Sequence, residues 1–156
     1  MERRRIAREP AGTYRLRLPA EERAVLRSLP GQLRELLQGD DPSLVRLFPP
    51  AYADDPDADA EYGDLVRREL RADRLAALRV VEETAGLERL DERQLGSWLD
   101  ALESLRLVLG TQLGVTEETY ASEPDPADPA AAALALYGYL SFLQEETVEA
   151  LSAGLP

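Results

Sequence analysis

Residues 95–113 read LGSWLDALESLRLVLGTQL, and this stretch sets the fold class. Its leucines recur every three or four residues around Trp98, the only tryptophan of the chain, which is the spacing of a buried helix face. Leu107 and Val108 add apolar residues on another side of the same helix. This breadth predicts a central helix that other elements contact from more than one direction.

Capping residues place the ends of the long helices. Asp91 and Gly114 bound the central helix, since Asp is a preferred N-cap and Gly is common just past a helix end. Asp59 and Gly86 bound a second helix in the same way. An acidic, proline-rich linker then precedes the last helix. The predicted long helices cover residues 60–86, 91–114 and 130–153.

The N-terminal third combines a strand pattern with a shorter helical segment. Residues 1–18 form an arm or hairpin, because Tyr14 to Leu18 alternate apolar and polar residues after the turn signal Pro10-Ala11-Gly12. Residues 19–39 form the first helical segment, which we expect Pro30-Gly31 to split into two short helices. Residues 1–156 are thus predicted to form one mainly α domain, a bundle of about five helices with a small N-terminal β-hairpin.

Residues 40–59 form a proline-aromatic and acidic loop, which contains Leu47-Phe48-Pro49-Pro50-Ala51-Tyr52. The two prolines make this connector stiff and non-helical. We interpret Phe48, Pro49, Pro50 and Tyr52 as a partner-binding segment, because exposed aromatic residues are frequent hot spots of interfaces. The alternative is that both aromatic side chains are core anchors.

Arg106 borders the apolar stripe of the central helix. A guanidinium there must reach water or pair with an acid, because an unpaired buried charge costs several kcal/mol. We expect a structural ion pair between Arg106 and Glu61, which opens the second helix.

Missing residue types exclude several classes of chemistry. All 18 basic residues are arginine, and the chain has neither histidine nor cysteine, so it lacks an imidazole base, a thiol nucleophile and a zinc-thiolate site. The acids around Asp55 to Glu61 do not fit a calcium loop, because Ala60 falls where the turn glycine belongs. We expect no catalytic residue, no cofactor and no metal site. The longest apolar run, residues 130–143, is too short to span a membrane, so a cytoplasmic protein is expected.

Charge is unevenly distributed along the chain. Residues 1–38 hold nine Arg and five acids, a net charge of +4, whereas the remainder has a net charge of −16. The acidic remainder would repel nucleic acid, so direct binding of nucleic acid is disfavoured. An arginine-rich N-terminal arm could still touch it, although the alternative is a solvated terminus. This arm carries Arg3, Arg4, Arg5 and Arg8.

The chain resembles an actinobacterial family that was long described as a domain of unknown function and is often encoded beside the Clp-protease adaptor. The resemblance rests on Leu47 to Tyr52, Glu61-Tyr62, Trp98-Leu99 and Leu105 to Thr111. Some members of that family are described as oxidative-stress transcriptional regulators that act through sigma factors and RNA polymerase. Members proposed as redox sensors use two cysteines near the N-terminus, which this chain lacks.

We therefore expect a non-enzymatic regulatory module that binds a protein, with RNA polymerase or a sigma factor as the partner implied by the resemblance. The alternatives are a partner of the Clp adaptor or protease, and a DNA-binding protein that uses the arginine-rich arm. An enzyme that uses paired carboxylates is the least favoured class, because no two acids are marked as converging. The apolar face from Leu136 to Leu151 could seal either the core or a homodimer.

Overall fold

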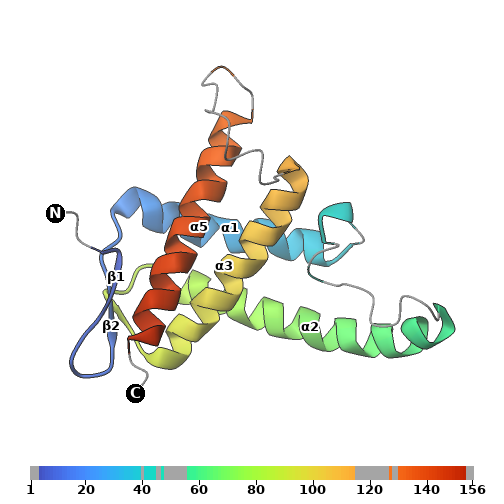
Figure 1. Cartoon of the computed structure of the whole chain (residues 1–156), viewed down its shortest axis with the longest axis horizontal. Coiled ribbons are helices and arrows are strands. Elements are labelled where there is room, and N and C mark those ends of the chain that lie inside the picture. Colours follow the sequence, from blue (N-terminus) through green and yellow to red (C-terminus); the bar gives the residue numbers. More distant parts are fainter. Residues whose placement is uncertain are drawn as a thin grey trace.

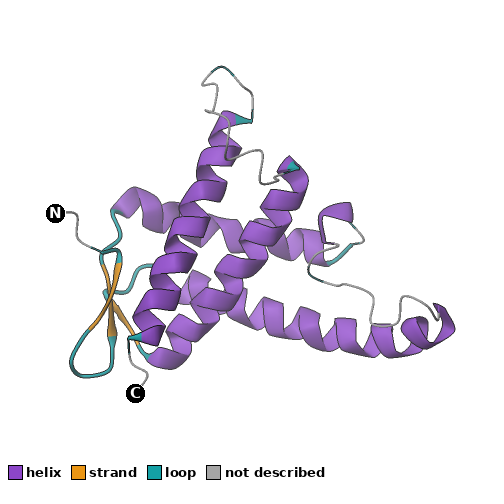
Figure 2. Ribbon diagram, in the orientation of Figure 1, coloured by secondary structure: helices purple, strands orange, loops and turns teal. Residues whose placement is uncertain are grey.

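The computed structural model describes residues 4–39, 41–44, 47, 56–114, 127 and 130–153, with side chains from residue 63 onward in the second long helix. Within these ranges the chain is mainly helical, with four α-helices rather than about five and a small antiparallel sheet (Figure 2). The elements are β1 (Ile6–Arg8), β2 (Tyr14–Leu16), α1 (Ala20–Leu37), the 3-10 turn η1 (Pro42–Leu44), α2 (Pro56–Thr84), β3 (Arg89–Leu90), α3 (Glu92–Leu113) and α5 (Ala131–Ser152).

Helix α3 is the centre of the fold, as its broad apolar pattern predicts. It lies side by side with α5 and also contacts α1, α2, η1 and β3 (Figure 1). Leu95, Trp98 and Leu102 are almost completely buried on it. None of the described helices is both long enough and apolar enough to cross a membrane.

The ends of α3 follow from its sequence. The Asp91 carboxylate accepts a hydrogen bond from the Gln94 backbone N–H at 2.7 Å, and the Gln94 side chain accepts one from the Asp91 N–H at 2.9 Å. This reciprocal capping box satisfies two donors that a helix start otherwise leaves open. At the other end Gly114 adopts a left-handed conformation with φ of 64°, which glycine reaches without strain. Both predicted helix boundaries are confirmed.

The N-terminal hairpin gains a third strand that the sequence pattern does not indicate. β1 pairs with β2 through a turn in which Gly12 has φ of 86°. β3 pairs antiparallel with β2, so that Tyr14 lies opposite Leu90. β3 has only two residues, which is too few to show an alternating pattern. Its position next to β2 depends on the turn that follows α2.

Helix α1 is continuous from Ala20 to Leu37, so the expected break at Pro30-Gly31 is wrong. A proline inside a helix removes one hydrogen bond and costs about 3 kcal/mol. Burial compensates for this cost, because Leu26, Leu33 and Leu37 on α1 are at most 2% exposed and each contributes about 1.5–3 kcal/mol. Pro30 itself is buried on the same side of the helix.

Helix α2 begins at Pro56, earlier than the predicted start near Ala60. Proline suits the first turn, where its missing N–H would have no helical partner, and Asp59 therefore lies inside the helix instead of capping it. The apolar spacing of this helix predicts Leu65, Ala77, Leu78 and Val81 on its buried side. Ala77, Leu78 and Val81 are buried, whereas Leu65 is 58% exposed.

Helix α5 covers its apolar face within the chain. Leu140, Leu143 and Thr147 are at most 1% exposed, and α5 packs on α3 and β1. Helices α3 and α5 approach each other closely at Gly110. A Cβ atom placed there would lie 2.9 Å from Cε2 of the Tyr137 ring, closer than ordinary van der Waals contact. Gly110 therefore allows Tyr137 to pack directly on the α3 backbone.

We expect Gly110→Ala to lower the free energy of unfolding by about 1–2 kcal/mol, because overpacking against the Tyr137 ring outweighs the helix propensity of alanine. Gly96→Ala on the same helix is the matched control. Nothing lies within 4 Å of its added Cβ, so it should raise the free energy of unfolding by up to about 1 kcal/mol. Urea denaturation measures both, and equal stabilisation by the two changes would contradict the close packing.

Candidate functional site: the surface around the start of α2

The chain that leads into the proline-aromatic segment is anchored in the core. Leu47 is 1% exposed, and its backbone N–H donates to the Leu44 carbonyl at 2.9 Å. Before it, the Asp41 carboxylate accepts hydrogen bonds from the Ser43 hydroxyl and from the Ser43 backbone N–H, and these bonds lower the pKa of Asp41. The chain thus leaves the core at a fixed point.

Beyond the segment, α2 begins at Pro56 and its N-terminal part extends past the other helices (Figure 1). The 29 residues of α2 make this helix about 43 Å long. Leu65 is the most exposed large apolar residue of the described chain. An apolar side chain on a projecting helix is available to another molecule.

The proposed binding residues Phe48, Pro49, Pro50 and Tyr52 lie outside the described residues, so their role stays a prediction. The structure describes the residues on either side of this segment. They connect a buried anchor, Leu47, to the start of a helix that projects from the body.

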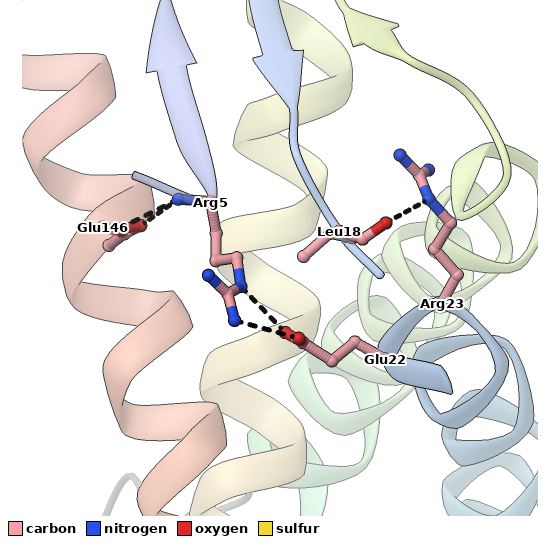
Figure 3. A network of polar contacts seen from close by, with 5 residues as sticks. All are labelled: Arg5, Leu18, Glu22, Arg23 and Glu146. Carbon is pink, nitrogen blue, oxygen red and sulfur yellow. Dashed lines mark hydrogen bonds and ion pairs between the residues drawn. The ribbon is translucent and has the colours of Figure 1, made fainter. Parts of the chain in front are cut away.

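Ion pairs join the arginine-rich arm to helices α5 and α1. Arg4 pairs with Glu149 near the end of α5 at 3.0 Å. The Arg5 guanidinium donates to both oxygens of Glu22 on α1 at 3.2 Å (Figure 3). Arg8 is exposed at the end of β1, and Arg3 lies outside the described residues. The arginines that the sequence groups together therefore have different surroundings.

Glu146 on α5 holds the backbone of the same arm. Its carboxylate accepts from the Arg5 N–H at 2.8 and 3.2 Å, and Glu146 is only 8% exposed (Figure 3). The hydroxyl of Tyr139 is buried, and burial together with the neighbouring Glu22 carboxylate raises the pKa of Tyr139. Acids on α1 and α5 thus fix the entry into β1, which gives this cluster a structural role.

Arg23 has a larger structural role that sequence reasoning missed. Its guanidinium donates hydrogen bonds to four backbone carbonyls, one of which is drawn in Figure 3. The acceptors and distances are Leu18 at 2.9 Å, Ala85 at 2.8 Å, Leu87 at 2.7 Å and Leu16 at 3.1 Å. In the sequence Arg23 is only one charge in the first turns of a helix.

We expect Arg23→Ala to lower the free energy of unfolding by about 2–3 kcal/mol, because several carbonyls lose a charged donor. Arg93→Ala, at an exposed arginine in the first turn of α3, is the matched control and should change it by less than about 0.5 kcal/mol. Thermal and urea unfolding test both variants. If both variants changed the free energy of unfolding by similarly small amounts, water would replace the hydrogen bonds of Arg23 without loss of stability.

Arg106 is half-buried and points to α5. Its Nη1 donates to the Gln144 side-chain oxygen at 3.0 Å, its Nε lies 3.4 Å from the Tyr137 hydroxyl, and its guanidinium carbon lies 5.8 Å from the centre of the Tyr137 ring. These contacts satisfy the charge next to the apolar stripe. The side chain of Glu61 is outside the described residues, so the ion pair between Arg106 and Glu61 stays a prediction.

Double-mutant cycles distinguish Gln144 from Glu61 as the partner of Arg106. We expect Arg106→Met and Gln144→Met to couple by about 0.5–1.5 kcal/mol in the free energy of unfolding, as for a partly buried hydrogen bond. The second cycle combines Arg106→Met with Glu61→Gln. Coupling in that cycle alone would overturn the assignment to Gln144 and support the ion pair with Glu61.

Among the described side chains, no group of three or more acids is placed to hold a metal ion. Comparison with known proteins gives one match. The sequence profile of a family described as a domain of unknown function, DUF2017, matches residues 2–151. No curated protein and no solved structure matches the chain.

Proposed function

The chain belongs to the DUF2017 family, and we propose that it is a non-enzymatic regulatory module that binds another protein. The observation that carries the proposal is the projecting start of α2. An apolar side chain, Leu65, is 58% exposed there, and the helix follows directly on the stiff segment with Phe48 and Tyr52. An exposed apolar residue such as Leu65 is suited to fill a pocket of a partner, and Phe48 and Tyr52 would add aromatic side chains to this surface.

The partner that we propose is RNA polymerase or a sigma factor, so that the module would regulate transcription during stress in the cytoplasm. The support is the resemblance of Leu47 to Tyr52 and of Leu105 to Thr111 to a family in which some members are described as such regulators. The net charge of −12 would favour contact with a basic face of the partner. Because the chain has no cysteine, its input would differ from disulfide formation.

A partner in the Clp system is the alternative within the same class, and it rests on the gene neighbourhood of the resembling family. Direct binding of DNA has weaker support. Arg4 and Arg5 already pair with Glu149 and Glu22, which leaves less of the arm's charge for phosphates.

The test uses purified RNA polymerase, a sigma factor and the Clp adaptor, each immobilised, with this chain in solution. We expect binding to one of the first two, weakened at least about tenfold in the combined variant Phe48→Ala, Tyr52→Ala and in Leu65→Ser, since hot-spot residues contribute 2 kcal/mol or more. Val148→Ser is the matched control, because Val148 is 43% exposed on α5, away from α2.

Circular dichroism and the melting temperature show whether each variant remains folded. Binding to the Clp adaptor alone would move the function to proteolysis. Equal weakening by Leu65→Ser and Val148→Ser, or full binding by every folded variant, would overturn the proposed surface.

A further inference from the structure

The three-stranded sheet has one face in the core and one face in solvent. Ile6, Tyr14 and Leu16 are at most 3% exposed and make up part of the core face. Because successive side chains of a strand point to opposite faces, Arg15 and Arg17 belong to the solvent face, and both are exposed. The sheet lies at one edge of the molecule (Figure 1).

Strand pairing brings a third arginine to the solvent face. Arg15 lies opposite Arg89 of β3, and residues directly opposite each other in an antiparallel pair share a face. Arg89 is also exposed. Arg15 and Arg17 are about 7 Å apart along the chain, since each residue of a strand advances by about 3.4 Å. The three arginines thus occupy adjacent positions on one pleated surface.

Glu9 is an acid that the structure places beside these arginines. Its carboxylate accepts a hydrogen bond from the Arg89 Nε at 2.9 Å. This bond lowers the pKa of Glu9, and the nearby charge of Arg15 lowers it further. Within the described residues, the side chain of Arg17 forms no hydrogen bond or ion pair. Arg89 already has an acidic partner, so a new contact depends on Arg15 and Arg17.

The charge of the rest of the chain decides which kind of acidic partner fits this face. Residues 39–156 have a net charge of −16, which would repel a long nucleic acid strand. A protein segment can carry its negative charge over a few residues only. Leu87, just before β3, is 45% exposed and gives the face an apolar border, which suits a peptide better than a phosphate backbone.

We propose that this face binds an extended acidic segment of a partner protein, with a carboxylate at every second residue. Alternate residues of an extended chain point to one side and are also about 7 Å apart, so two carboxylates match Arg15 and Arg17. The planar guanidinium group receives a carboxylate through two parallel hydrogen bonds. The solvent face of the sheet is thus a docking surface for a short acidic strand.

This surface is separate from the one proposed at the start of α2. The sheet and the projecting start of α2 lie at opposite ends of the molecule (Figure 1). The inference therefore does not rest on the proposed function. Loss of the acidic segment would leave binding through Leu65 in place, and changes at Leu65 would leave the sheet unaffected.

The probe is the capped peptide Asp-Thr-Asp-Leu-Asp-Thr, titrated into the full chain at about 10 mM salt, where exposed charges are weakly screened. We expect binding at peptide concentrations below about 5 mM, with shifts of the backbone amide signals of Arg15 and Arg17 in nuclear magnetic resonance spectra. The rearranged peptide Thr-Leu-Thr-Asp-Asp-Asp and a version with Asn in place of Asp should bind at least about fivefold more weakly.

Two variants test the location. The combined variant Arg15→Gln, Arg17→Gln should weaken binding at least about fivefold, because it removes both guanidinium groups that lack a strong internal partner. Glu9→Gln keeps an acceptor for Arg89 but removes a competing charge, so it should strengthen binding about twofold to threefold.

The matched control is the combined variant Arg79→Gln, Arg93→Gln, which changes the net charge equally at exposed arginines of α2 and α3 and should leave binding unchanged. The melting temperature shows that each variant is folded. No binding at about 5 mM, equal binding of the rearranged peptide, or equal weakening by the two combined variants would overturn the proposal. Tighter binding of a single-stranded oligonucleotide with three phosphates, or self-association of the chain that Arg15→Gln, Arg17→Gln abolishes, would assign the face to another occupant and overturn it too.

Discussion

The guanidinium of Arg23 joins parts of the chain that are far apart in sequence. Its four hydrogen bonds reach carbonyls of β2, of the connection into α1, and of the turn between α2 and β3. That turn sets where β3 pairs with β2, and it also sets where α3 begins, because β3 leads directly into the cap at Asp91. One side chain therefore fixes the relative positions of the sheet, α1 and the α2–α3 hairpin.

Several polar groups elsewhere in the core are also satisfied within the chain. The indole N–H of Trp98 donates to the Thr84 hydroxyl at 2.7 Å, and that hydroxyl donates to the Val80 carbonyl at 2.6 Å. The Ser104 hydroxyl accepts from Arg74 at 2.7 Å. Such bonds join α2 to α3 and avoid the cost of a buried donor without an acceptor. These polar and charged side chains of the core helices thus serve the fold.

The sequence predicted the features that depend only on residues close to one another along the chain. The cap at Asp91, the left-handed Gly114 and the apolar stripe around Trp98 all act within one or two helical turns, and each was found as expected. The continuity of α1 through Pro30 could not be predicted, because it depends on burial against other helices. Arg23 was missed for a similar reason, since two of its acceptors lie more than 60 residues away. Of the candidate site, the sequence predicts the proline-aromatic segment, whose role stays a prediction, while the buried anchor at Leu47 and the exposure of Leu65 required the tertiary structure.

The hydrogen bonds from the Arg5 N–H to the Glu146 carboxylate help to keep the protein soluble. The sheet has the order β1-β2-β3, so β1 is an edge strand, and open edges can add strands from other molecules. Helix α5 lies against β1, and Glu146 occupies a backbone donor just before it, while the opposite edge strand has only two residues. The C-terminal helix therefore also shields the sheet from intermolecular strand addition. A chain cut short before α5, as during synthesis or after proteolysis, would expose that edge and be prone to aggregate.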